Sequence, residues 1–193
     1  MKYNLSDDIN RAVELLEKKE IIIHSTDTLP GLACDATSDK AINKIIQLKN
    51  RTGPFSIIVN SIEDIKNYSI FNDVKITLIK NILPGPFTVL LKNNNKNNLS
   101  KLATNQSPLI GFRIPNHNFT NQLSKKFNNP IITTSINLTG QNPVIDLKKI
   151  AKNFKDIYIY NDGIKKLSKG STILDFSNKK ITILRNGDGI YNK

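Results

Sequence analysis

The chain has 193 residues, a formal net charge of +12, one cysteine and two histidines. Its length suits a single domain over residues 1–193 with a core of its own, and the lone Cys34 excludes an internal disulfide and fits a reducing cytoplasm. No stretch approaches the roughly 20 apolar residues of a membrane-spanning helix, and the polar start of the chain does not resemble a signal peptide, so we expect a cytoplasmic protein with no membrane partner.

Six segments have the apolar spacing or the capping residue of a helix. The predicted helices are Asp7–Lys18 capped by Ser6, a segment capped by Ser38 that carries Ala41, Ile42, Ile45, Ile46 and Leu48, a short helix opened by Ser61–Asp64, and the segments Asn72–Asn81, Phe119–Phe127 and Asp146–Phe154. Ser61–Asp64 has the pattern of a capping box, and the prolines of Leu83–Pro86 end the helix before them.

Eight apolar or β-branched segments predict strands. They are Ile21–Ile23, Ser56–Val59, Phe87–Leu91, Leu109–Arg113, Ile131–Thr134, Tyr158–Tyr160, Thr172–Asp175 and Ile181–Leu184. The alternation with helices predicts an α/β fold whose twisted, mixed parallel and antiparallel sheet is flanked by helices. The last strands follow one another closely, which predicts that they pair antiparallel.

Arginine is scarce in this chain, which has 4 arginines and 24 lysines. A guanidinium presents a rigid fork of donors that grips phosphate or carboxylate with two hydrogen bonds, and an ammonium cannot copy this geometry. Arg51, Arg113 and Arg185 lie at the ends of predicted elements, whereas Arg11 lies within a helix. The three terminal arginines predict either one anion site assembled from distant segments or three ordinary surface salt bridges.

Polar groups follow two predicted strands, in residues 24–32 (His-Ser-Thr-Asp-Thr-Leu-Pro-Gly-Leu) and 131–140 (Ile-Ile-Thr-Thr-Ser-Ile-Asn-Leu-Thr-Gly). Strand ends are a usual place for ligand groups in α/β folds, although plain turns give the same pattern. The role of the segment Lys49-Asn50-Arg51 also has two interpretations. The segment suits either a polyphosphate clamp or a solvated helix end whose cations complement the helix dipole.

Several common catalytic patterns are absent from the sequence. It has no Gly-x-Ser-x-Gly nucleophile elbow, no Walker loop and no dinucleotide glycine fingerprint. His24 and His117 are expected to be structural or surface residues, and one cysteine with two histidines does not predict a zinc site. Dispersed lysine without an aromatic-rich strand predicts a basic concave face for nucleotide phosphates, with tRNA or another RNA as an additional candidate partner.

Seven short segments, taken in order, resemble the YrdC/TsaC family, the threonylcarbamoyl-adenylate synthases of tRNA modification. The segments that match family motifs are Ser25–Leu32, Lys49–Arg51, Leu83–Thr88, Arg113–Pro115, Thr134–Gly140, Ser171–Asp175 and Leu184–Gly187. The resemblance covers nearly the whole chain and implies a single YrdC-like domain with a basic concave face. The chain resembles the short form of the family, without the extra C-terminal domain of some members.

The resemblance implies a nucleotidyltransferase that makes threonylcarbamoyl-AMP and pyrophosphate from L-threonine, bicarbonate and ATP, for N6-threonylcarbamoyladenosine at position 37 of tRNA. It also implies Mg²⁺ carried by ATP rather than by protein side chains, and a downstream threonylcarbamoyl transferase complex as a partner. Carried over position by position, the catalytic clamp is Lys49 and Arg51, the ATP-binding residues are Lys49, Arg51, Ser135, Asn137 and Arg185, and the threonine-binding residues are Thr26, Arg113, Thr134 and Ser171.

The chain departs from the family pattern at a few positions. Ser25 and Thr52 replace prolines, the loop from Arg51 to Phe55 looks shorter, and Ile136 replaces a small alanine expected beside the nucleotide. Two other functions stay open. One is a basic RNA-binding module of the same fold without synthase activity. The other is a carbamoyl-transfer domain like that of hydrogenase-maturation proteins, which usually belongs to a much longer chain with zinc-finger and acylphosphatase parts.

Overall fold

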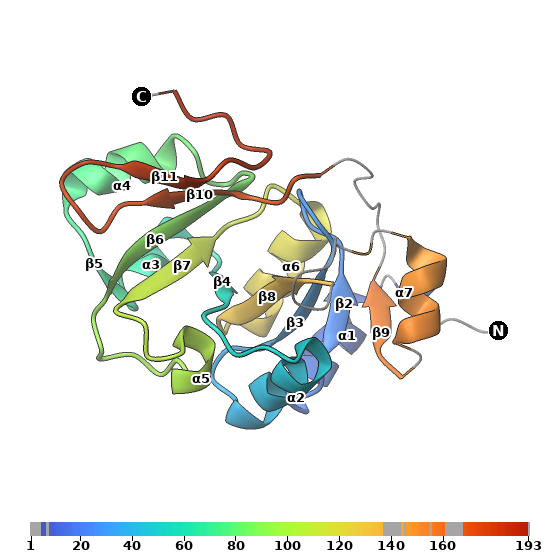
Figure 1. Ribbon diagram of the computed structural model, residues 1–193. Helices are drawn as coiled ribbons and strands as arrows, with labels where there is room; N and C mark the ends of the chain where they lie inside the picture. The colour runs from blue at the N-terminus through green and yellow to red at the C-terminus, as the bar shows by residue number, and fades with distance from the viewer. Residues whose placement is uncertain are drawn as a thin grey trace.

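The computed structural model describes Leu5–Ser6 and residues 8–136, 144, 146–154, 156–160 and 168–192. The strands are β1 (Leu5–Ser6), β2 (Ile22–His24), β3 (Gly31–Asp35), β4 (Ser56–Ile58), β5 (Ser69–Ile70), β6 (Phe87–Asn93), β7 (Leu109–Arg113), β8 (Ile131–Ser135), β9 (Tyr158–Tyr160), β10 (Thr172–Asp175) and β11 (Thr182–Arg185). The helices are α1 (Ile9–Glu17), α2 (Asp39–Lys49), α3 (Ile62–Ile65), α4 (Asp73–Lys80), α5 (Lys101–Thr104), α6 (Asn118–Phe127) and α7 (Leu147–Asn153). The predicted alternation of helices and strands is confirmed (Figure 1).

Side-chain caps fix the start of α2, α3 and α4. Ser38 Oγ accepts a hydrogen bond from the Ala41 backbone N–H at 3.3 Å, and Ser61 and Asp64 form the predicted capping box of α3. Asn72 caps α4 in the same way. These polar side chains satisfy backbone donors that no helical carbonyl can reach, which is why the local sequence predicts these boundaries well.

The predicted start of the first helix was wrong. Asp8, rather than Ser6, is the N-cap of α1, and its carboxylate accepts from the Asn10 backbone N–H at 2.9 Å and the Arg11 backbone N–H at 3.3 Å. Ser6 is the last residue of β1. A carboxylate at the N-cap also complements the positive end of the helix dipole, so Asp8 is the stronger of two neighbouring capping candidates.

All described strands belong to one mixed sheet with the order β1-β9-β2-β3-β8-β4-β7-β6-β10-β11, and β5 pairs with β6 off this path. β3 is antiparallel to both β2 and β8, whereas β4 runs parallel to β7 and β6 runs parallel to β10. The mixed sheet and the antiparallel pair of β10 and β11 are therefore as predicted. The prediction was wrong for β9, which lies at the other side of the sheet, parallel to β2 and β1. Closeness in sequence does not report such a long-range parallel pairing.

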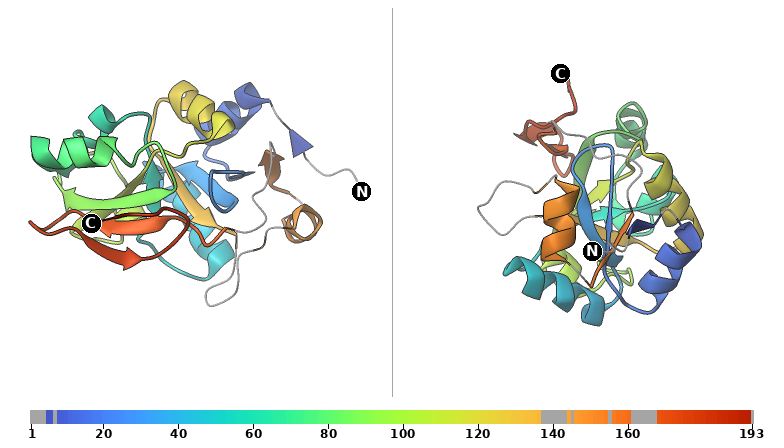
Figure 2. Two further views of the ribbon diagram at one scale, coloured as in Figure 1. Left: turned by 90° about the horizontal axis from the view of Figure 1, so that it is seen from above. Right: turned by 90° about the vertical axis from the view of Figure 1, so that its right-hand side faces the viewer.

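Helices cover both faces of the sheet (Figure 2). α1 and α6 lie on one face, where Leu16, Phe119 and Tyr160 belong to one apolar cluster and the two aromatic rings stack with centroids 5.1 Å apart. α2 and α7 lie on the opposite face, whose larger cluster includes Ile42 and Ile150. Burying such side chains stabilises the fold by roughly 1.5–3 kcal/mol each, so the sheet is anchored from both faces and polar residues are left at the strand ends.

The unpredicted strand β3 is central to the site. Every residue of β3 is buried, so its sequence lacks the alternation of a half-exposed strand. β1, β5 and α5, which are only two to four residues long, were missed as well. A Cβ on Gly31 would lie 2.7 Å from Thr133 Oγ1. The glycine at the start of β3 therefore lets this strand approach β8 closely at the end where β8 presents Thr133, Thr134 and Ser135.

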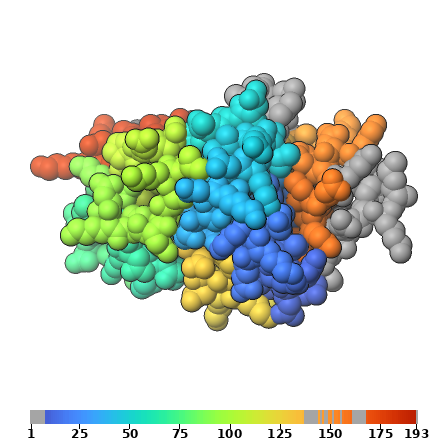
Figure 3. All heavy atoms as spheres, turned by 90° about the horizontal axis from the view of Figure 1, so that it is seen from below, coloured from blue at the N-terminus to red at the C-terminus, as the bar shows by residue number. Residues whose placement is uncertain are grey.

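The face in Figure 3 carries the blue-to-cyan segments that include α1 and α2. The yellow-green region around α5 lies to one side and the orange region of α7 to the other. Within the described residues, none of the helices has the length and apolar character needed to cross a membrane.

Candidate active site

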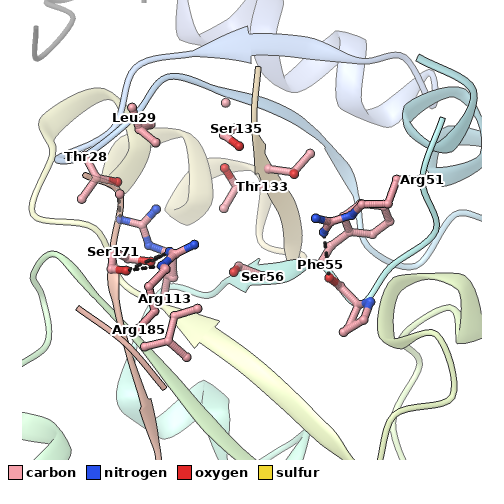
Figure 4. Close-up of a pocket in the computed structure, with 15 residues that line it drawn as sticks. Thr28, Leu29, Arg51, Phe55, Ser56, Arg113, Thr133, Ser135, Ser171 and Arg185 are labelled. Atoms are coloured by element: carbon pink, nitrogen blue, oxygen red, sulfur yellow. Dashed lines mark hydrogen bonds between the residues drawn. The ribbon is translucent and has the colours of Figure 1, made fainter. Parts of the chain in front are cut away.

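A polar pocket of about 290 Å³ joins segments that are far apart in the sequence (Figure 4). Its lining consists of Thr28, Leu29, Gly31, Arg51, Pro54, Phe55, Ser56, Arg113, Thr133, Thr134, Ser135, Gly170, Ser171, Ile173 and Arg185. Three of these residues carry a guanidinium, six carry a hydroxyl group, and none carries a carboxylate. Such a lining suits an anionic ligand with several oxygen atoms.

Arg113 is the buried cation of this pocket. It ends β7 and is 6% exposed. Its Nη2 donates to Asp27 Oδ1 at 2.6 Å and to Thr28 Oγ1 at 3.1 Å. Burial lowers the pKa of Arg113, the charge of Asp27 opposes that shift, and the nearby charge of Arg185 adds to it. The guanidinium stays charged, because arginine does not lose its proton in proteins, so a fixed positive charge lies in the pocket wall.

The turn between β2 and β3 is held together by its own side chains. Thr26 Oγ1 donates to the Leu29 carbonyl at 2.8 Å and accepts from the Thr28 backbone N–H at 3.0 Å. The hydroxyl oxygens of Thr26 and Thr28 are 3.2 Å apart. Because Thr26 has already given its one hydrogen to Leu29, Thr28 must be the donor between them. Thr26 is buried behind the pocket and shapes the turn, whereas Thr28 and Leu29 face the pocket.

Ser171 is fixed from two directions. Its hydroxyl oxygen lies 2.7 Å from Thr88 Oγ1. Arg185 donates to the Ser171 carbonyl from Nε at 3.0 Å and from Nη2 at 2.8 Å, and Nη2 also donates to the Ser171 hydroxyl oxygen at 3.0 Å. Gly170 precedes this residue with a φ of +83°, a conformation that favours glycine. Arg185 therefore lies beside Arg113 on one wall of the pocket (Figure 4).

Arg51 lies on the opposite wall (Figure 4). It follows Asn50, which ends α2 with a left-handed φ of 49°, and it is exposed. Its Nε donates to the Thr52 carbonyl at 3.3 Å and its Nη2 to the Pro54 carbonyl at 3.4 Å, while its guanidinium carbon lies 5.8 Å from the centroid of the Phe55 ring. These are long hydrogen bonds within its own loop, so the guanidinium can turn toward a ligand at little cost.

Lys49 supports the pocket from behind rather than lining it. It is the last residue of α2 and is 3% exposed, and its Nζ donates to the Ser135 carbonyl at 2.6 Å. Burial, followed by the charge of Arg51, lowers the pKa of Lys49 to about 8. Lys49 therefore ties the end of α2 to the end of β8, where Ser135 faces the pocket.

Both histidines have structural positions. His24 is completely buried, and burial lowers its pKa to about 3, which keeps the ring neutral. Its ring nitrogens lie 3.4 Å from Thr120 Oγ1 and 3.5 Å from Thr133 Oγ1. His117 is the N-cap of α6, and its Nδ1 accepts from the Thr120 backbone N–H at 3.5 Å. Neither ring is part of the pocket lining, so the pocket contains no histidine base.

The structure brings together most of the residues that the family resemblance assigns to substrates. Six of them line the pocket: Arg51, Arg113, Thr134, Ser135, Ser171 and Arg185. Thr26 and Lys49 lie behind it, and Asn137 lies outside the described residues. Ile136, expected beside the nucleotide, is completely buried and belongs to the larger core cluster.

The sequence-based assignment missed the partners that hold these residues. Asp27 and Thr88 both lie inside the matched motifs, yet their pairing with Arg113 and Ser171 depends on contacts between segments that are far apart along the chain. It also missed Phe55 and Ser56, which line the pocket. The position of these two directly after the Arg51 loop was the available signal.

The described part of the chain contains no group of three or more His, Cys, Asp or Glu side chains that could hold a metal ion. The lining offers fixed positive charge and hydroxyl groups, which can bind and orient anions and stabilise developing negative charge. Chemistry in this pocket would therefore depend on positioning and electrostatics.

The chain is similar to several known proteins. The Sua5_yciO_yrdC family model, described as "Telomere recombination", matches residues 14–187. A Psychromonas ingrahamii protein named threonylcarbamoyl-AMP synthase is 31% identical over 159 residues, which cover 80% of this chain and 82% of that protein. The structure of E. coli YciO matches with a TM-score of 0.84 at 23% identity and covers 96% of this chain and 94% of that one. P. abyssi Sua5 in complex with L-threonine also matches with a TM-score of 0.84 at 23% identity over 93% of this chain, which spans 54% of the Sua5 chain. These likenesses confirm the predicted fold.

Proposed function

The chain belongs to the Sua5/YciO/YrdC family, and we propose that it is an L-threonylcarbamoyladenylate synthase of the cytoplasm. On this proposal it is a nucleotidyltransferase that converts L-threonine, bicarbonate and ATP into threonylcarbamoyl-AMP and pyrophosphate. A downstream transferase complex would then use the adenylate to form N6-threonylcarbamoyladenosine in tRNA. Support comes from a relative that carries the synthase name and aligns with most of this chain.

The observation that carries the proposal is the convergence of three arginines on one pocket, which has no carboxylate among the described residues that line it. Both organic substrates present anionic groups, since an amino acid brings a carboxylate and ATP brings a triphosphate. Bringing them together requires positive charge that offsets their repulsion. In a chain with 24 lysines and 4 arginines, arginine at these positions indicates that the fork matters as well as the charge.

We assign the two walls of the pocket to different substrates. Arg113 would bind the carboxylate of threonine, with Thr134 and Ser171 lining the same pocket and Thr26 shaping the turn behind it. A buried, fixed guanidinium suits a small ligand with one carboxylate.

The opposite wall would bind ATP. Arg51 would contact the phosphates, with Lys49 and Ser135 at the adjoining strand end, and Asn137 carries over from the family motif as a nucleotide contact. Arg185 carries over as a phosphate contact too. Because it lies beside Arg113, the phosphate chain would have to reach across the pocket to meet it.

The reaction needs no covalent intermediate on the protein. Bicarbonate gives CO₂ and hydroxide, and the neutral threonine amine adds to the carbon of CO₂. The proton that the amine loses converts the hydroxide to water, which leaves a carbamate. A carbamate oxygen then attacks the α-phosphorus of ATP, the bond from that phosphorus to the bridging oxygen breaks, and pyrophosphate leaves. The guanidiniums would stabilise the charge that moves onto pyrophosphate and would hold the two reactants in contact.

Mg²⁺ belongs to the proposal as a companion of ATP. In the part of the chain that the structure describes, the lining offers hydroxyl oxygens but no carboxylate, whereas protein-bound Mg²⁺ usually has one or two carboxylate ligands. We therefore assign it no protein ligand, and the phosphates of ATP and water would hold it.

Detection of threonylcarbamoyl-AMP by mass spectrometry tests the proposal. Purified protein incubated with ATP, bicarbonate and L-threonine should form the adenylate and an equal amount of pyrophosphate. Reactions without bicarbonate, or with L-serine in place of threonine, are the controls. Failure to form any adenylate from threonine under these conditions would contradict the proposal.

A second candidate function is RNA binding without synthase activity, which the net charge of +12 favours. Single-turnover ATP consumption separates the two functions, because a binding module would show no consumption that depends on threonine and bicarbonate. Such a module would bind RNA with an affinity that falls steeply as salt is raised.

A further inference from the structure

The proposed reaction does not explain the contacts that Asp27 makes. It lies in the turn between β2 and β3, and its side chain is 9% exposed. Its Oδ1 accepts from Arg113 Nη2 at 2.6 Å, and its Oδ2 accepts from the Asn116 backbone N–H at 3.0 Å. The carboxylate therefore connects the turn to the arginine that ends β7 and to the chain just beyond that strand.

The hydrogens on Nη2 of Arg113 can be assigned one by one. Nη2 carries two hydrogens and has two acceptors, Asp27 Oδ1 and Thr28 Oγ1. The Thr28 hydroxyl gives its own hydrogen to Thr26, so its oxygen is an acceptor toward Arg113. The turn thus uses both hydrogens of this nitrogen.

This use of Nη2 restricts how Arg113 can bind a ligand. A guanidinium binds a carboxylate with two parallel hydrogen bonds either through Nε and Nη2 or through Nη1 and Nη2. Both of these edges include the nitrogen that the turn already holds. The Nε of Arg113 is buried, and no hydrogen-bond partner for it lies among the described residues. Since Nε is buried and Arg113 also lines the pocket, Nη1 is the donor that remains for a ligand.

We propose that Asp27 is a positioning residue, which holds Nη2 of Arg113 in the turn so that Nη1 meets the carboxylate of the amino-acid substrate. The identity of that ligand rests on the proposed function. A guanidinium that the turn holds at Nη2 cannot swing, so it fixes the direction from which the carboxylate approaches more strictly than a free guanidinium would. Asp27 thereby sets the orientation in which threonine presents its amine to the carbon that becomes the carbamate.

Two substitutions of Asp27 separate its charge from its shape. Asp27→Asn keeps an acceptor oxygen and removes the charge, whereas Asp27→Ala removes both. Losing a charged hydrogen-bond partner should weaken threonine binding roughly 3- to 10-fold in the Asn variant and about 10- to 100-fold in the Ala variant. ATP affinity should stay within about twofold, because the opposite wall is untouched. Asp73→Asn, an exposed carboxylate in the first turn of α4, is the matched control and should leave both affinities unchanged.

A second readout does not require any substrate. The chain has four arginines, so the NMR region of arginine Nε–Hε groups holds four side-chain signals. The Arg113 Nε–H should exchange slowly with water in the wild-type protein because it is buried. In Asp27→Ala that signal should exchange faster, while the signals of Arg11 and Arg51 stay in place. A role of Asp27 in stability alone would not single out this signal.

The outcomes separate the positioning role from its rivals. Wild-type threonine affinity in Asp27→Ala, together with an unchanged Arg113 signal, overturns the inference. Tighter threonine binding also overturns it, because Asp27 would then compete with the substrate for Nη2. If the wild-type protein neither binds threonine nor forms the adenylate, the proposed function fails, and the NMR comparison still decides whether Asp27 holds Arg113. If the Ala variant does not fold, the Asn variant decides by the same two readouts.

Discussion

The two walls of the pocket hold their arginines in opposite ways. Arg113 is 6% exposed and donates to a buried carboxylate at 2.6 Å. Arg51 is exposed, and its contacts with described residues are backbone carbonyls of its own loop, at 3.3 and 3.4 Å, and the face of a phenylalanine ring. The same side chain is thus fixed in direction on one wall and adjustable on the other. A fixed guanidinium suits a small carboxylate that arrives in one orientation, and an adjustable one suits a triphosphate that moves during the reaction.

The largest effect that we expect comes from the adjustable wall. Arg51→Lys should lower the rate of adenylate formation by roughly 30- to 1000-fold, because a lysine cannot replace two donors on a phosphate in the transition state. The free energy of unfolding should change by less than about 0.5 kcal/mol, since the side chain is exposed. Rate measurements and urea titrations on the same preparation check both expectations.

Arg11→Lys is the matched control for that substitution. Arg11 lies on α1, bonds to Glu14 at 2.5 Å and lies over the ring of Tyr158, so its replacement should leave the rate unchanged. An Arg51→Lys variant within twofold of the wild-type rate would show that this wall needs only a positive charge.

A substitution on the fixed wall should change ligand affinity and stability rather than the rate alone. Arg113→Ala should weaken threonine binding by roughly 1.5–3 kcal/mol, about 10- to 150-fold, and ATP binding much less. It should also lower the free energy of unfolding by about 3 kcal/mol, because the Asp27 carboxylate would stay buried without its partner. Calorimetric titration of each ligand and chemical denaturation measure these effects. If ATP binding collapses while threonine binding holds, the assignment of the two walls is reversed.

The difference between the walls also marks how far the sequence could predict the site. Arg51 and its neighbours form one short segment, and its motif, its loop and its place after a capped helix are all local features. Arg113 could be predicted to end a strand for the same reason. The pairing of Arg113 with Asp27 could not be predicted, because this contact joins residues 86 positions apart and depends on the order of strands in the sheet.

The same reasoning explains the errors in the predicted fold. Helices capped by Ser38 and Ser61 were predicted because the cap and the apolar face are local. β3 was missed because it is buried along its whole length and begins with glycine. β9 was misplaced because its partner β2 lies at the opposite end of the chain. Local chemistry sets the elements, and long-range pairing decides which of them share a pocket.

A smaller effect would sharpen the contrast on the fixed wall. Thr88→Val removes the hydroxyl that lies 2.7 Å from Ser171 Oγ without changing the size of the side chain much. Threonine binding should weaken about fivefold, close to 1 kcal/mol, because Arg185 still holds Ser171. Thr182→Val, on the exposed part of β11, is the control for the same chemical change. Equal effects of the two substitutions on threonine affinity would remove Ser171 from the fixed wall.

The last effect acts on the stability of the fold rather than on ligand affinity, and it concerns the support behind the pocket. The pKa of Lys49 falls from 10.5 to about 8 on folding, so between these values the unfolded chain holds a proton that the folded protein has lost. The free energy of unfolding should therefore rise with pH in this window. Compared with Lys49→Met, the wild-type protein should gain roughly 1–2 kcal/mol between pH 7.5 and pH 9.5. Denaturation at both pH values measures the difference, and parallel curves for the two proteins would show that Lys49 keeps an ordinary pKa.

The pairing of β9 with β2 has a consequence for synthesis of the chain. The outer edge of the buried strand β2 (Ile22–His24) stays uncovered until Tyr158–Tyr160 have been made. At typical translation rates that delay is on the order of ten seconds. An uncovered apolar edge strand is a template for pairing with other chains. Nascent chains should therefore need a ribosome-bound chaperone during this interval, and chains that terminate before β9 should aggregate rather than fold.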